Sequence, residues 1–144
     1  MMDTRASVRI ILVVAATLLL ATSVPADQSR PMRGSFTGSG FTFTGNYSHM
    51  GLITGEVTSF IPTPSGGLLT SIAVAADGDE LHASSELTIT GANPSTGMLT
   101  FVQVLDFTGG TGRFEGATGQ VQATGEVAAD QSSFFGEFTG WIDY

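Results

Sequence analysis

The chain of 144 residues contains no cysteine and no lysine, and each absence narrows what the protein can be. Without cysteine no disulfide can staple the fold, so the hydrophobic core must be sufficient by itself. Without lysine only five arginines oppose thirteen acidic residues, and the formal net charge is −8. A chain this acidic repels phosphate backbones and anionic bilayers, which excludes nucleic acid as a partner and disfavours such membrane surfaces.

Long apolar runs are also missing, except near the N-terminus. There Arg5 and Arg9 precede an apolar run of 11 residues from Ile10 to Leu20, and Val24-Pro25-Ala26 offers small residues for cleavage. A membrane-spanning helix needs roughly 18 apolar residues or more, so the pattern predicts a signal peptide over residues 1–26 rather than a retained anchor. No cysteine is present to carry a lipid. We therefore expect a secreted or periplasmic protein that leaves the membrane after cleavage.

The remaining 118 residues are enough for one domain with a sizeable core. They keep all ten phenylalanines, but only three arginines against twelve acids. A chain of this size buries roughly two-thirds of its unfolded surface. We expect a flexible lead-in over residues 27–33 and a single domain over residues 34–144.

The rest of the chain alternates apolar and polar residues with a period of two, as Phe41 and Phe43 do with Thr42 and Thr44. Such alternation is typical of strands with one buried face, and Asp77-Gly78 between two alternating runs indicates a hairpin. No segment has convincing helical periodicity. The expected strands begin at Gly34 and continue over residues 47–60, 68–75, 80–90, 99–107, 120–128 and 134–144. Together they predict an all-β fold, an up-and-down antiparallel barrel of seven or eight strands.

The densest glycine cluster follows the strand at residues 99–107. It reads Gly109-Gly110-Thr111-Gly112-Arg113-Phe114-Glu115-Gly116-Ala117-Thr118-Gly119. The cluster resembles the turn of the allene oxide cyclase and dirigent barrels, and more closely that of small exported bacterial proteins of unassigned role. Ser48-His49-Met50-Gly51 is similar to a His-x-Gly element of those bacterial chains. We expect Gly109, Gly110, Gly112, Gly116 and Gly119 to be structural turn residues.

The resemblance implies a closed barrel of about eight strands, often trimeric, with an interior that can take a small apolar molecule. Allene oxide cyclases close an unsaturated fatty-acid epoxide, and dirigent proteins steer the radical coupling of phenols. No catalytic motif of either family can be placed on this chain, so the resemblance implies a fold and a type of interior, but no catalytic residue.

Other motifs favour structural roles. Gly110-Thr111-Gly112 is followed by more strand pattern and not by the helix that a phosphate-binding loop requires. The acids Asp77, Asp79 and Glu80 lack the regular spacing of a calcium loop and are expected at a solvated hairpin tip. His49 and His82 are the only histidines, and neither has a partner at metal-ligand spacing. We expect no metal and no cofactor.

The strand phase suggests which polar groups point into the barrel. If the apolar faces line the interior, then Tyr47, His49, Ser85 and Gln103 point inward with them. Ligand pockets are mostly apolar with a few oriented polar groups, and this set fits that description. Arg113 is a further candidate that could neutralise an anionic ligand or pair with Glu115 or Asp106. A packed core whose polar groups satisfy one another is the alternative.

These observations favour an exported barrel without catalytic activity that binds a small apolar ligand or serves as a stable scaffold. The alternative is a cofactor-free isomerase or cyclase resembling allene oxide cyclase, with His49 as the base. A third interpretation is a homo-oligomer that associates through a patch on the outer face of the last strand. That patch would comprise Phe135, Glu137, Trp141 and Asp143.

Overall fold

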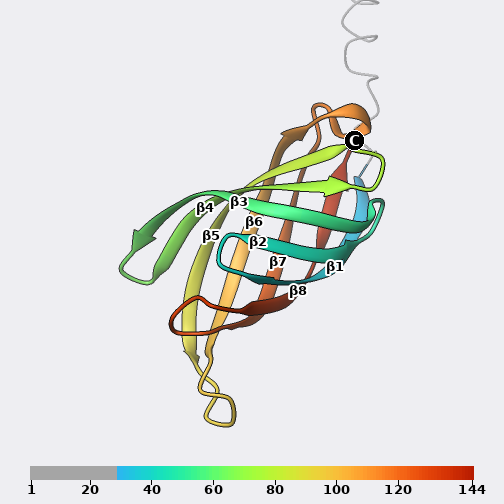
Figure 1. The fold of residues 1–144 in the computed structure, drawn as a ribbon. Helices are drawn as coiled ribbons and strands as arrows, with labels where there is room; N and C mark the ends of the chain where they lie inside the picture. Colours follow the sequence, from blue (N-terminus) through green and yellow to red (C-terminus); the bar gives the residue numbers. More distant parts are fainter. Residues whose placement is uncertain (1–28) are drawn as a thin grey trace, which may run out of the picture.

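The computed structural model describes residues 29–144, and the expected signal peptide lies outside them. Eight antiparallel strands follow one another around a barrel, which β1 and β8 close (Figure 1). The strands are β1 (Ser29–Ser39), β2 (Thr42–Tyr47), β3 (Gly51–Thr63), β4 (Gly66–Ala75), β5 (Glu80–Ala92), β6 (Leu99–Gly110), β7 (Thr118–Val127) and β8 (Phe134–Asp143). A single 3-10 turn, η1 (Gly112–Phe114), interrupts the described strands. The all-β class and the closed antiparallel barrel are therefore confirmed, with eight strands.

The two ends of the barrel differ. At one end lie η1 and the turns β2–β3 and β4–β5, and the side chains beneath them form the packed core. Phe114, Met32, Ile142 and Val121 are its largest fully buried members. We call this the closed end. The turns β1–β2, β3–β4, β5–β6 and β7–β8 lie at the other end, which we call the open end.

The open end is splayed because neighbouring strands have unequal lengths. Pairing between β2 and β3 stops at Thr42 and Glu56, whereas β3 and β4 remain paired as far as Thr63 and Gly66. The β3–β4 and β5–β6 hairpins consequently project beyond the other strands (Figure 1). Pro62 lies in the projecting part of β3, and proline on an edge strand discourages pairing with another chain.

Two boundaries differ from the sequence-based expectation. The lead-in expected over residues 27–33 is in part strand, because β1 begins at Ser29 and Met32 points into the core with 1% of its surface exposed. The strand expected over residues 47–60 is divided by a turn at residues 48–50. His49 makes this turn possible by adopting a left-handed conformation, with φ of +69°. A register irregularity in β3 falls between Val57 and Ser59.

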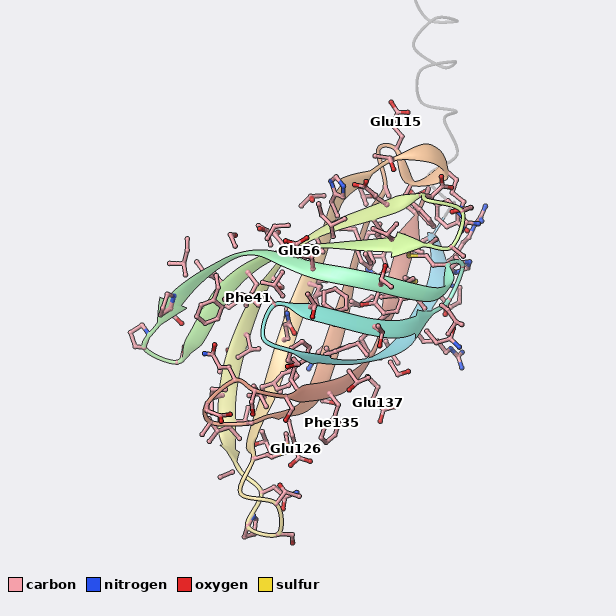
Figure 2. All side chains as sticks on the ribbon, viewed as in Figure 1. Phe41, Glu56, Glu115, Glu126, Phe135 and Glu137 are labelled. Atoms are coloured by element: carbon pink, nitrogen blue, oxygen red, sulfur yellow. The ribbon has the colours of Figure 1, made fainter. Side chains whose placement is uncertain are left out.

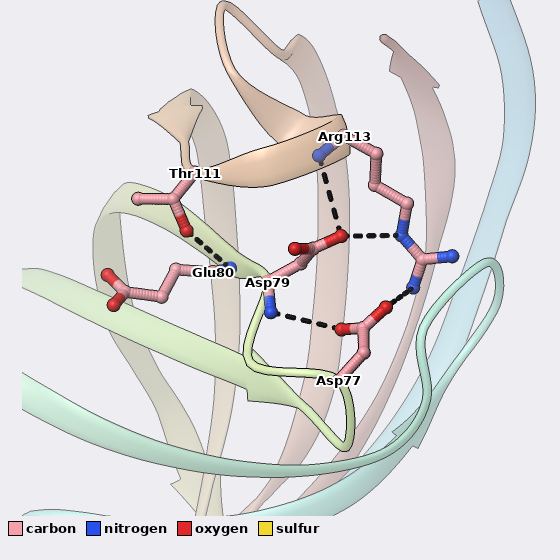
Figure 3. Close-up of polar contacts among 5 residues, drawn as sticks. All are labelled: Asp77, Asp79, Glu80, Thr111 and Arg113. Carbon is pink, nitrogen blue, oxygen red and sulfur yellow. Dashed lines mark hydrogen bonds and ion pairs between the residues drawn. The ribbon is translucent and has the colours of Figure 1, made fainter.

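The β4–β5 hairpin and the glycine cluster meet at the closed end (Figure 3). The Glu80 N–H donates to Thr111 Oγ1 at 3.0 Å, and the Thr111 N–H donates to the Glu80 carbonyl oxygen at 3.0 Å. Arg113 lies 3.4 Å from Asp79 and 3.8 Å from Asp77. The acidic hairpin tip therefore fastens η1 to the barrel wall. We expected Arg113 to pair with Glu115 or Asp106, but it pairs with Asp79 and Asp77 instead.

Candidate ligand-binding cavity

The open half of the barrel contains a cavity of about 240 Å³. Aromatic rings supply much of its wall, because seven of the ten phenylalanines line it together with Tyr47. The seven are Phe36, Phe41, Phe43, Phe60, Phe101, Phe134 and Phe138. Six of these rings lie on strands, where the alternation of side chains turns them inward. Phe41 reaches the cavity from the β1–β2 turn. The barrel is thus packed at its closed end and hollow at its open end.

The polar groups of the cavity are few. Gln103 and Ser71 line the wall among aliphatic side chains such as Leu69, Leu87 and Leu105. The Gln103 Nε2–H donates to Ser85 Oγ at 2.8 Å, and Ser85 is itself buried. This bond fixes the side-chain amide across two neighbouring strands, β5 and β6. The arrangement matches an apolar ligand pocket with one oriented polar group.

Tyr47 contributes a second polar group. Its ring packs edge-on against Phe138, with 4.8 Å between the ring centroids. Burial raises the pKa of the Tyr47 phenol above its usual range, so the hydroxyl stays protonated at neutral pH. A neutral phenol can donate or accept a hydrogen bond, but it is a poor general base.

Of the five residues expected in a ligand site, Tyr47 and Gln103 line the cavity, and Ser85 supports Gln103. His49 and Arg113 lie at the closed end, away from the lining. The Nε2–H of His49 donates to the Pro31 carbonyl oxygen at 2.8 Å, and its ring packs against Tyr144. The left-handed turn at His49 breaks the alternation that would have pointed its ring inward.

Sequence reasoning missed part of the cavity wall. The β7–β8 turn contributes Ala128, Ala129 and Gln131, and it is joined to the β1–β2 turn by the Gly40 N–H, which donates to the Gln131 carbonyl oxygen. Turn residues carry no period-two signal that would place them over a cavity. The phenylalanines on the strands do follow the period-two pattern, which predicts that they point into the barrel. The pattern does not distinguish a packed interior from a hollow one.

Charge is distributed unevenly along the barrel. Arg30, Arg33 and Arg113 all lie toward the closed end, where Arg30 stacks on Tyr144 and Arg113 stacks on Phe114. Figure 2 shows Glu126 and Glu137 toward the other end. Within residues 29–144 no three acidic or histidine side chains come together as a metal site. The same part of the chain has no helix with the length and apolarity needed to cross a membrane.

Comparisons with family models, with curated proteins and with solved structures find no match to this chain. The function must therefore be inferred from the geometry of the cavity. That geometry offers shape, apolar surface and a few neutral polar groups, among them Gln103 and Tyr47.

Proposed function

We propose that this protein binds a small apolar molecule in the open half of its barrel, and that it works outside the cytoplasm after export. The observation that carries the proposal is the aromatic cavity of about 240 Å³ at the open end. Protein interiors are normally close-packed, because filling the interior stabilises the fold. An unfilled apolar cavity that opens to solvent is therefore typical of a ligand-binding site.

The magnitude of the expected affinity follows from area. A ligand that buries about 200 Å² of apolar surface gains roughly 5 kcal/mol before the entropic cost of association is subtracted. Dissociation constants of a few tenths of a millimolar or weaker are therefore expected for simple apolar probes, roughly the millimolar range. A hydrogen bond to Gln103 or Tyr47 would orient the ligand and distinguish it from molecules of similar size.

The glycine turn and the eight-stranded barrel support placing the chain with the allene oxide cyclase and dirigent barrels, and we propose that superfamily for it. Catalysis of the allene oxide cyclase type has less support than binding. His49 and Arg113, the side chains that would serve it, lie at the closed end, and Tyr47 is the one titratable group in the lining among the described residues.

The test is a fluorescence titration of the mature protein with uncharged N-phenyl-1-naphthylamine, paired with two neighbouring substitutions. Leu69 lines the cavity, whereas the next residue, Leu68, faces outward. We expect Leu69→Trp to weaken probe binding about ten-fold or more by filling the cavity, and Leu68→Trp to leave it unchanged. Thermal melting checks that both variants are folded. Absence of binding to the wild-type protein, or equal binding to both variants, would leave a scaffold role in place of this function.

A further inference from the structure

The wall of the cavity is chemically specific as well as apolar. Eight aromatic rings line it, counting Tyr47, whereas the outward-facing residues of the same strands are mostly threonine, serine and acids. The face of an aromatic ring carries negative potential, and a cation within about 6 Å of the ring centroid is attracted to it. Enclosure by several rings at once is how proteins bind quaternary ammonium groups.

No positively charged side chain lines this cavity among residues 29–144, so an anion has no cationic partner there. Among residues 29–144, no arginine or histidine belongs to the lining, and the sequence has no lysine. Arg113 is held by Asp79 and Asp77 at the closed end, and Arg30 is stacked on Tyr144. Because burying a carboxylate without a partner costs several kcal/mol, the cavity disfavours fatty acids and other amphiphilic anions.

The rim of the cavity is acidic. Asp130 lies in the β7–β8 turn between Ala129 and Gln131, both of which line the cavity. Hydrogen bonds from Ser132 lower the pKa of the Asp130 carboxyl, so it stays ionised. Glu126 precedes Val127, a further lining residue, and faces the outer side of β7 at the open end. There it accepts a hydrogen bond from Thr96 in the β5–β6 turn at 3.0 Å. These carboxylates produce a negative potential at the open end that attracts cations.

We propose that the ligand of this cavity is an organic cation, an ammonium or quaternary ammonium group carried on an apolar body. The proposal rests on the function proposed above and adds the charge of the ligand to it. The apolar body enters the hollow half of the barrel, and the charged group lies among ring faces near the acidic rim. The aromatic lining and the segregation of the arginines are separate observations that favour the same ligand class.

The test compares three probes of similar size by ligand-observed NMR titration. They are benzyltrimethylammonium, its uncharged isostere neopentylbenzene, and the anion phenylacetate. Phe41→Leu is the test variant, because Phe41 lines the cavity while 56% of its surface is exposed. Phe135→Leu is the matched control, because Phe135 is also exposed, at 45%, but lies on the outer face of β8 (Figure 2). Neither substitution removes a buried core side chain.

We expect the cation to bind at least about ten-fold more tightly than the anion. Phe41→Leu should weaken the cation about three-fold or more while changing the affinity of the isostere by less than about two-fold. Phe135→Leu should change neither. Binding of the anion as tightly as the cation would overturn the proposal. Binding of the isostere together with a cation that is indifferent to Phe41→Leu would also overturn it, while leaving the proposed function intact. Failure of all three probes to bind would count against both.

Discussion

Gly112 shows how a single residue fixes the glycine turn. Its φ is +59°, and a Cβ atom at this position would collide with the carboxylate of Asp79. The same carboxylate accepts a hydrogen bond from the Arg113 N–H at 3.4 Å. Glycine is therefore needed here for two reasons, its left-handed backbone and its lack of a side chain. Gly116, in the same turn, has φ of +75° but nothing near the place of a Cβ.

We expect Gly112→Ala to lower the free energy of unfolding by about 2–3 kcal/mol. The alanine would be strained by its left-handed backbone, and its Cβ would also displace the Asp79 carboxylate. Gly116→Ala should cost only about 1 kcal/mol, because it suffers the backbone strain alone. Urea unfolding followed by Trp141 fluorescence measures both. Equal losses in the two variants would mean that contact with Asp79 does not constrain the turn.

At the level of elements, the closed end depends on the junction between the β4–β5 hairpin and η1. Two hydrogen bonds join Glu80 and Thr111, and Arg113 adds ion pairs that remain partly in solvent, with 42% of its side chain exposed. Exposed ion pairs contribute little to stability, whereas an unsatisfied backbone group costs more. The neutral hydrogen bonds should therefore matter more than the charges.

We expect Thr111→Val to lower the free energy of unfolding by about 1 kcal/mol, because the Glu80 N–H loses its acceptor. Arg113→Ala should cost about 0.5 kcal/mol or less. Denaturant titration gives both values, and hydrogen exchange at the Glu80 amide should accelerate in Thr111→Val. Thr111→Ser, which keeps the hydroxyl, should restore most of the loss. A larger loss in Arg113→Ala than in Thr111→Val would reverse this ranking.

Local pattern predicted most of the elements, because the strands alternate and Asp77-Gly78 marks its hairpin. Local pattern does not predict features that lack a characteristic sequence of their own. In Ser48-His49-Met50 the left-handed position is occupied by histidine and not by glycine or asparagine, so the sequence does not reveal the turn between β2 and β3. Sequence proximity favours Glu115 or Asp106 as the partner of Arg113, whereas Asp77 and Asp79 reach it only because the hairpin packs against η1. Contacts of this kind depend on the closed barrel and are not visible in the spacing of residues.

The whole molecule divides into a packed half and a hollow half, and this division could not be predicted from sequence. Phase placed Tyr47 and Gln103 inside correctly, but the same phase describes a filled interior equally well. The hollow depends on how far neighbouring strands extend. Whole-chain composition is nevertheless informative about pH, because the absence of lysine and cysteine leaves few groups to titrate in alkaline solution.

Stability should therefore fall above about pH 10 mainly through Tyr47. An unfolded chain releases the phenolic proton near its ordinary pKa of about 10, while the folded protein holds it because burial raises the pKa of Tyr47. The unfolded state then binds fewer protons than the folded state, and the free energy of unfolding falls by about 1.4 kcal/mol per pH unit. Below about pH 10 the phenol is protonated in both states and adds no slope.

Urea unfolding at a series of alkaline pH values checks this dependence, with Tyr47→Phe as the comparison. We expect the variant to lose most of the slope. An unchanged slope in Tyr47→Phe would show that the phenol is not shielded by the folded barrel.

The separation of the packed closed end from the cavity has a consequence for how this protein can evolve. Met32, Val121 and Ile142 are fully buried at the closed end, whereas the rings that line the cavity gather toward the open end of the same barrel. Substitutions at Phe41, Phe60 and Phe134, which are not part of that core, can therefore alter the cavity over evolution without removing a side chain on which the closed end depends.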